Sequence, residues 1–153
     1  MLVDLLLVAL LLPIVWIDSR KLVIPDWANL GLGLVGVTVS YAMLARAPIL
    51  ILAEAAAVTA TTILVMRIYA GIRGQDGLGW GDVKMLAALS TWVGAYGAAW
   101  VVLIASLSGL ALVVVQWMRL GDSAFERRWP FGPHLAVGLF VVWVSRNFLL
   151  VGQ

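Results

Sequence analysis

The sequence predicts an all-α, polytopic membrane protein with about six transmembrane helices, and its composition is the first reason. Of the 153 residues, 63% are hydrophobic and only 12% are charged. Soluble domains carry about 25% charged residues, and only about 45–50% of their residues are apolar even when glycine is counted. A soluble domain of this size could not hide so much apolar surface from water. We therefore expect a single membrane-embedded domain over residues 1–153, with short connections between its helices.

Long apolar runs are the second reason, because a helix needs about 20 mostly apolar residues to cross a bilayer. Six such runs are predicted to form the membrane helices, and they cover residues 2–17, 27–44, 48–69, 83–96, 98–117 and 133–150. Only a weak break around Gly94 and Gly97 separates the fourth run from the fifth, so one bent segment remains an alternative. The first run is not a secretory signal, because it lacks a basic start and does not end in small residues.

The distribution of basic residues predicts the topology, since lysine and arginine favour the cytoplasmic side of a membrane. Eight of the ten belong to, or border, the odd-numbered connections: Arg20, Lys21, Arg67, Arg73, Lys84, Arg119, Arg127 and Arg128. Arg46 and Arg146 lie near the other side. We expect both termini outside and the odd-numbered connections in the cytoplasm.

Several classes of function are excluded by residue counts. The chain has no cysteine and a single histidine, His134. A disulfide framework, a thiolate nucleophile and a cysteine- or histidine-rich metal site are therefore ruled out. The net charge of +2 comes from scattered basic residues that form no stripe, so we expect no nucleic-acid partner.

Asp18 and Asp82 differ from the other acidic residues because each lies at the predicted cytoplasmic end of a membrane helix. Asp18 ends the first helix and Asp82 opens the fourth. If these two helices touch, the two carboxyl groups meet at one membrane depth. Two negative charges about 4 Å apart repel by about 4 kcal/mol at an effective dielectric of 20. Such a pair would share one proton, as in an aspartic protease dyad that activates water.

Glu54 lies about two turns inside the third predicted span, where a charge costs at least about 2.5–3.5 kcal/mol. We interpret it as a structural residue, either neutral or paired with a neighbouring helix. The alternative function class is a small transporter or proton-conducting subunit, in which Glu54 would be central. A noncatalytic assembly subunit is a third possibility.

A glycine-rich connection precedes Asp82, with five glycines in the eleven positions from Gly71 to Gly81. Glycine is unfavourable in helices, so the segment predicts a tight and adaptable backbone beside the carboxyl group. Gly79 and Gly81 would allow a peptide to approach closely. The spacing fits neither a P-loop nor a dinucleotide-binding motif, since Trp80 follows Gly79 where a P-loop has lysine. A flexible turn is the alternative.

Three sequence blocks, in order, resemble those of the type IV prepilin peptidases. They are residues 18–26 (Asp-Ser-Arg-Lys-Leu-Val-Ile-Pro-Asp), 79–84 (Gly-Trp-Gly-Asp-Val-Lys) and 129–133 (Trp-Pro-Phe-Gly-Pro). The second is similar to the GxGD signature of intramembrane aspartyl proteases. The resemblance implies an enzyme of the inner (plasma) membrane that cleaves the leader peptide of prepilin or pseudopilin precursors at the cytoplasmic face, without a metal or cofactor.

By the same resemblance, Asp18 and Asp82 are the catalytic pair, and Gly79, Gly81 and Lys84 belong to the active-site loop. Lys84 has two alternative uses: it could ease the charge penalty of the pair, or it could extend to the lipid headgroups. Membrane lipid is the second expected partner, and the oligomeric state stays open.

The chain also departs from the larger, bifunctional family members, which carry a four-cysteine zinc region and methylate the new pilin N-terminus. Here there is no cysteine, and the first residues already belong to the first peptidase span. We expect an aspartic-type endopeptidase without methyltransferase activity, similar to the short enzymes that serve Flp/Tad-type pili. The presenilin branch is less similar, because its YD and PAL motifs are missing.

Overall fold

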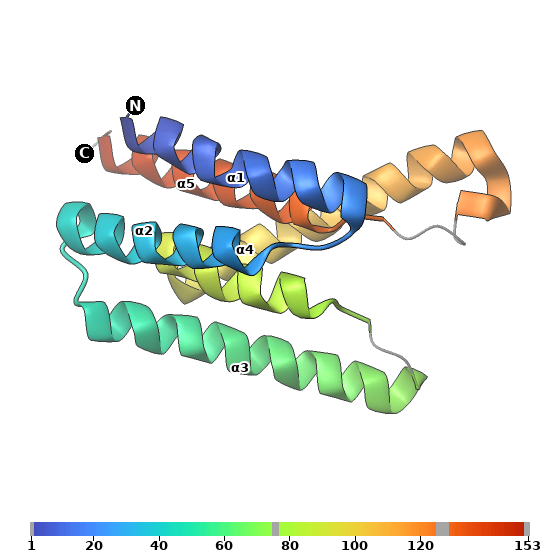
Figure 1. Cartoon of the computed structure of the whole chain (residues 1–153), viewed down its shortest axis with the longest axis horizontal. Helices are drawn as coiled ribbons and strands as arrows, with labels where there is room; N and C mark the ends of the chain where they lie inside the picture. The colour runs from blue at the N-terminus through green and yellow to red at the C-terminus, as the bar shows by residue number, and fades with distance from the viewer. Residues whose placement is uncertain (1, 75–76, 125–128, 152–153) are drawn as a thin grey trace.

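The computed structural model describes residues 2–74, 77–124 and 129–151, and these ranges form helices and no strand. The helices are α1 (Leu2–Lys21), α2 (Asp26–Leu44), α3 (Pro48–Arg73), α4 (Trp80–Leu120) and α5 (Gly132–Val151), with a short 3-10 turn, η1 (Gly121–Ala124). Figure 1 shows them as a bundle of roughly aligned helices. Within the described ranges, α1 to α4 are each long and apolar enough to cross a membrane. The predicted all-α membrane fold is confirmed.

Helix α4 consists of two halves that meet at Gly94. Gly94 has φ +76° and ψ 177°, which is not helical, and positive φ favours glycine. The second half runs back toward the end of the molecule where the first half began (Figure 1). The break predicted around Gly94 and Gly97 therefore exists and is confined to the first of these glycines. Counting the halves separately, the described chain has the six segments that hydropathy predicted.

Glu54 on α3 holds this break in place. Its Oε2 accepts hydrogen bonds from Arg46 Nη2 at 2.7 Å and from the backbone N–H of Ala95 at 2.8 Å. Ala95 begins the second half of α4, and the first N–H groups of a helix have no partner within it. Glu54 therefore caps that half, and Arg46 compensates its charge. This pairing agrees with the structural interpretation of Glu54.

The first half of α4 packs closely against α2. A Cβ on Gly36 would lie 2.1 Å from Thr91 Oγ1, so no larger residue fits there without a shift. Small residues allow such close approach between membrane helices. Ser40 Oγ donates to the carbonyl of Thr91 at 2.6 Å, and Trp92 Nε1 donates to the carbonyl of Leu32 at 2.9 Å. Their polar groups are thus satisfied between helices rather than left in lipid.

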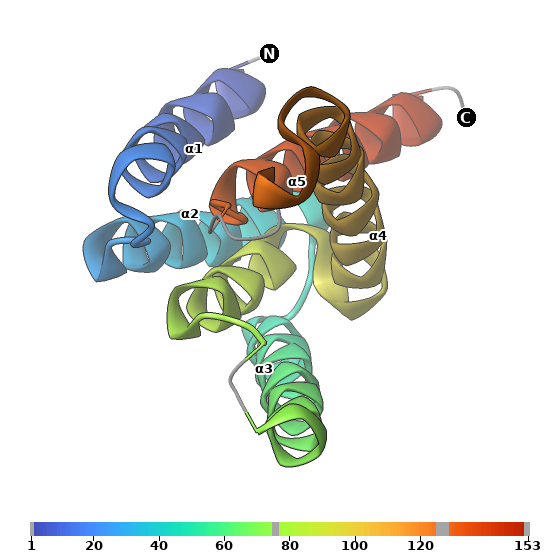
Figure 2. The same ribbon diagram turned by 90° about the vertical axis from the view of Figure 1, so that its right-hand side faces the viewer.

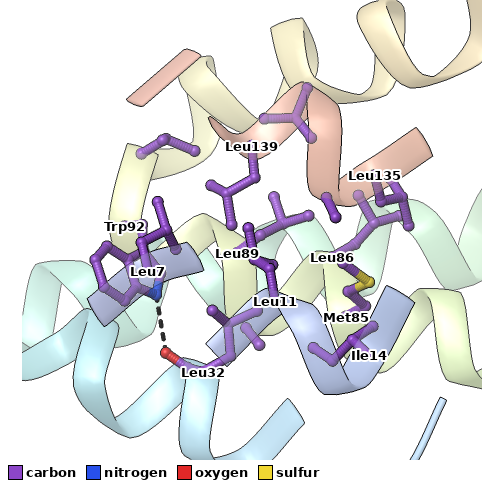
Figure 3. Close-up of a cluster of buried hydrophobic side chains, with 14 of the residues drawn as sticks. Leu7, Leu11, Ile14, Leu32, Met85, Leu86, Leu89, Trp92, Leu135 and Leu139 are labelled. Atoms are coloured by element: carbon purple, nitrogen blue, oxygen red, sulfur yellow. Dashed lines mark hydrogen bonds between the residues drawn. The ribbon is translucent and has the colours of Figure 1, made fainter. Parts of the chain in front are cut away.

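Apolar side chains from α1, α2, α4 and α5 form one core around the first half of α4 (Figure 3). Its fully or nearly fully buried members include Leu7, Leu11, Ile14, Leu32, Met85, Leu86, Leu89, Leu135 and Leu139. The rings of Trp92 and Trp143 meet edge to face, with 5.3 Å between their centroids. This core fixes the last turn of α1 and the first turns of α4 and α5 relative to one another.

Helix α3 lies at the periphery of the bundle (Figure 2). It packs mainly on α4 and has only two buried residues in its described length, Ile51 and Met66. Its exposed apolar side chains suit contact with lipid or with another apolar segment. Helix α1 begins, and α5 ends, at the same end of the molecule (Figure 1).

Candidate active site

One pocket is lined by the last turn of α1, by the connection from α1 to the start of α2, and by the first turn of α4. Asp18 lies in α1 and Asp82 in α4, and both line this pocket, whose volume is about 490 Å³. The two carboxyl groups are close enough to interact electrostatically. The structure thus brings together the two carboxyl groups on which the sequence-based prediction rests.

The Asp18 carboxyl group is almost fully covered, with 4% of the residue exposed. Its Oδ2 accepts a buried hydrogen bond of 2.9 Å from the backbone N–H of Gly132, at the start of α5. The start of a helix carries partial positive charge, which suits a carboxyl group. A Cβ on Gly132 would lie 2.7 Å from Oδ2 and 3.1 Å from Cγ of Asp18. Only glycine therefore fits here without displacing the carboxyl group.

Gly132 was missed as a site residue by the sequence analysis, which cited its block, residues 129–133, only for the resemblance. The signal was a glycine at the predicted start of the last span. A backbone N–H carries no side-chain signature, so its role in holding Asp18 becomes visible only when α1 and α5 are placed side by side.

Asp82 is oriented by the start of its own helix. Gly79 is the N-cap residue of α4, with extended backbone, and Asp82 follows three residues later. The backbone of Gly79 forms a hydrogen bond with the Asp82 carboxyl group, and Asp82 N donates to Gly79 O at 3.1 Å. The bond between the Asp82 carboxyl group and the backbone of the N-cap residue is one half of a capping box; Gly79 has no side chain to form the other half. Asp82 is half-buried and so more accessible than Asp18.

The two loop glycines are both positions of close approach. A Cβ on Gly79 would lie 3.2 Å from Asp82 Oδ2, and a Cβ on Gly81 would lie 3.2 Å from Ile24 Cβ. Ile24 belongs to the connection between α1 and α2. The sequence predicted room for a substrate backbone at these glycines. At Gly81, however, the close neighbour is a segment of this same chain.

Lys84 lies at the pocket, and its ammonium group pairs with Asp26. Nζ is 2.7 Å from Asp26 Oδ1, and the two side chains are 51% and 76% exposed. An exposed pair of this kind contributes at most about 1 kcal/mol to stability. The two uses considered for Lys84 did not include this contact, which ties the start of α2 to the start of α4.

Other singled-out residues lie away from the pocket or outside the described ranges. His134 Nδ1 lies 2.9 Å from Ser108 Oγ, so the histidine joins α5 to the second half of α4. Arg127 and Arg128 fall outside the described residues. Within the described ranges no group of three histidine or carboxylate side chains could hold a metal ion.

Comparison with known proteins identifies the family. Residues 5–114 match the type IV leader peptidase family. The chain belongs to this family. The matched range contains Asp18, Asp82 and the loop between Gly79 and Lys84, and the resemblance inferred from the three sequence blocks is confirmed.

Individual relatives of this chain are bacterial proteins. It is 36% identical to the prepilin leader peptidase/N-methyltransferase of Xanthomonas campestris pv. campestris over 139 residues, which cover 89% of this chain and 47% of that protein. It is 30% identical to the protein of the same name from Aeromonas hydrophila, and the match covers 95% of this chain and 53% of that protein. Leader peptidase HopD of Escherichia coli is 40% identical over 86 residues, which cover 56% of this chain and 54% of HopD. The chain thus spans about half the length of these relatives. No solved structure matches it.

Proposed function

We propose that this chain is an aspartic endopeptidase that removes the leader peptide from type IV prepilin or pseudopilin precursors, including those of the Flp/Tad type. Membership in the type IV leader peptidase family supports the reaction class. The observation that carries the proposal is one pocket lined by both Asp18 and Asp82, two carboxyl groups that are far apart in the sequence.

The pair activates water in the proposed mechanism. Two neighbouring carboxyl groups oppose each other's ionisation, so one stays protonated at neutral pH while the other is a carboxylate. The carboxylate takes a proton from water, which attacks the scissile carbonyl carbon. The protonated group donates a hydrogen bond to the carbonyl oxygen as negative charge develops there. The pair titrates as a unit, so neither Asp18 nor Asp82 is assigned to one role.

The substrate reaches the pair along an apolar groove between α3 and the second half of α4. The groove has a volume of about 700 Å³, and Val58, Met66 and Val102 are among its lining residues. It continues to Gly77 and Leu78, directly before the loop that carries Gly79. An apolar segment of the precursor in this groove would leave its leader at the aspartate pocket. The residues at the scissile bond must be extended there, because a helix engages its carbonyl groups in hydrogen bonds.

The proposed orientation puts the aspartate pocket at the cytoplasmic face of the inner membrane and both termini outside. Arg20 and Lys21 follow Asp18 at the end of α1, and Arg73 and Lys84 lie at the same end of the bundle. Positive residues favour the cytoplasmic side. In this orientation the leader would be cut where a cytoplasmic segment enters the bilayer.

Co-expression with a pilin precursor encoded near the gene tests the proposed function. We expect the intact mass of the pilin to decrease by the mass of its leader, because the aspartate pair hydrolyses one peptide bond. We also expect the new N-terminus to lack a methyl group, as proposed for a peptidase without methyltransferase activity. An uncleaved precursor beside well-inserted enzyme would contradict the peptidase proposal. A methylated product would contradict only its second part.

The transporter alternative made Glu54 the central residue. In the structure its carboxylate binds Arg46 and the N–H of Ala95, at the opposite end of α4's first half from Asp82. The bond to Ala95 is explained by capping the second half of α4, and the bond to Arg46 by compensation of the charge of Glu54. No observation favours an ion pathway through this residue, so the transporter is not proposed.

A further inference from the structure

At the end of the molecule opposite the aspartate pocket, two arginines line a second pocket, of about 980 Å³. Arg46 comes from the connection between α2 and α3, and Arg146 comes from α5. These two segments lie at the same end of the bundle (Figure 1). The remaining wall is mostly apolar and includes Tyr96 and Trp100, whose rings meet edge to face with 6.4 Å between their centroids.

The charges in this pocket do not balance. Arg46 Nη2 is 2.7 Å from Glu54 Oε2, which accounts for one positive charge. Arg146 interacts electrostatically with both of these groups but forms no ion pair among the described residues. One positive charge is therefore left over. Because like charges repel, holding two guanidinium groups near each other in a partly buried site costs free energy.

A hydrogen-bond donor is also left without an acceptor. Arg46 Nη1 is covered by protein and has no hydrogen-bond partner. Buried donors in folded proteins are almost always satisfied, so an unpaired one calls for an explanation such as a missing ligand. The surplus positive charge therefore favours an anion, and the buried Arg46 Nη1 would reach that anion after a turn of its guanidinium group.

We propose that this pocket binds the phosphate group of an anionic membrane phospholipid. Arginine matches phosphate because its planar guanidinium presents parallel N–H donors to two oxygens. The apolar wall that includes Ile104 and Val142 suits the acyl chains, and Tyr96 and Trp100 are residue types typical of the membrane interface. Free phosphate would satisfy the same arginines but would leave the apolar wall empty. This proposal does not depend on the proposed peptidase function.

A bound lipid would stabilise the bundle rather than take part in hydrolysis. The pocket joins the connection between α2 and α3, the bend at Gly94 and the second half of α5. A phosphate between Arg46 and Arg146 would hold these three segments together. The ligand should therefore raise the thermal stability of the protein without being required for cleavage.

The test uses the purified full-length protein, stripped of lipid in a neutral detergent. Thermal unfolding is measured with dioleoylphosphatidylglycerol, with inorganic phosphate and with dioleoylglycerol, which has the acyl chains but no phosphate. We expect phosphatidylglycerol to raise Tm, and its apparent affinity to fall about tenfold in Arg146→Gln, since a charge-assisted contact is lost. Arg119→Gln, an exposed arginine near the other end of the bundle, is the matched control and should bind like wild type.

Each outcome separates the alternatives. Equal affinity of wild type and Arg146→Gln for phosphatidylglycerol would overturn the proposal, and so would equal stabilisation by dioleoylglycerol. Stabilisation by inorganic phosphate alone, lost in Arg146→Gln, would support the phosphate site and overturn its assignment to a lipid. Leader cleavage by Arg146→Gln should stay within about twofold of wild type, as for substitutions away from the reacting groups, so loss of the lipid site and loss of peptidase activity are distinguishable.

Discussion

Replacing either Asp18 or Asp82 by asparagine is expected to abolish leader cleavage while the protein still inserts and folds. Asparagine has nearly the same shape but can neither accept the proton of water as a carboxylate does nor serve as the acid. Loss of one acid–base group costs about 10²–10⁴-fold in rate. In Asp18→Asn, the amide oxygen can still accept the hydrogen bond from Gly132, so the contact between α1 and α5 is kept. The measurement is the cleavage rate of a prepilin by each purified variant, beside its level in the membrane.

Asp4→Asn is the matched control for these two variants. Asp4 lies at the other end of α1, where its Oδ1 accepts a hydrogen bond from Trp143 Nε1 at 2.9 Å. The same chemical change there should leave the cleavage rate within about twofold of wild type, because Asp4 is far from the pocket and an asparagine oxygen can still accept the hydrogen bond from Trp143. Cleavage retained by either Asp18→Asn or Asp82→Asn would show that the reaction does not need the pair.

Gly132→Ala should reduce cleavage strongly although it removes no titratable group. The added methyl group would lie 2.7 Å from Asp18 Oδ2, so either the carboxyl group or the start of α5 must move. A displacement of about 1 Å at a reacting group costs about 100-fold in rate. We expect the loss in kcat, with KM little changed, because in either role Asp18 stabilises the transition state rather than the bound leader. Steady-state kinetics of the purified variant measure both constants.

Gly71→Ala is the control for this substitution. Gly71 lies in α3, and a Cβ there would meet no atom within 4 Å. Alanine is the better helix former, so Gly71→Ala should leave cleavage unchanged and stability equal or slightly higher. If Gly132→Ala cleaved as fast as Gly71→Ala, the contact between Gly132 and Asp18 would have no role in positioning the carboxyl group.

The membrane helices were predictable because hydropathy measures the apolar side chains, and these are the side chains that face the lipid or form the core. The end of α1 shows where this signal stops. The apolar run ends at Ile17, whereas the helix continues to Lys21. The next residue, Leu22, has φ +54° and so lies outside the helix. Backbone hydrogen bonds carry a helix into the polar membrane edge. Asp18 therefore lies inside the helix, within its last turns, rather than just after it.

The break in α4 was predicted only weakly because its cause lies in another helix. A single glycine is tolerated inside a helix at about 1 kcal/mol, so Gly94 alone does not decide between a bend and a continuous span. The bend is supported by Glu54, which caps the second half through the N–H of Ala95. Glu54 is distant in the sequence, and no local pattern links it to that position.

Asp18 and Asp82 were singled out from the sequence because each lies at a predicted membrane-helix end on the same side and within a block that resembles the family. The groups that position these two carboxyl groups were not identified from the sequence. Gly132 acts through its backbone, and the pairing of Lys84 with Asp26 depends on how α2 and α4 are placed. Contacts of this kind arise from tertiary packing, which residue types and spacing do not encode locally.

The proximity of the two carboxyl groups is tested most directly by cross-linking, because the chain has no cysteine. Asp18→Cys combined with Asp82→Cys is treated in the membrane with a short bifunctional thiol reagent, and the intact mass reports bridged protein. The control combines Asp4→Cys with Asp82→Cys, since Asp4 is about 21 Å from Asp18 along α1. We predict a bridge in most molecules of the first variant and in almost none of the control. Equal, low bridging in both would contradict a shared aspartate pocket.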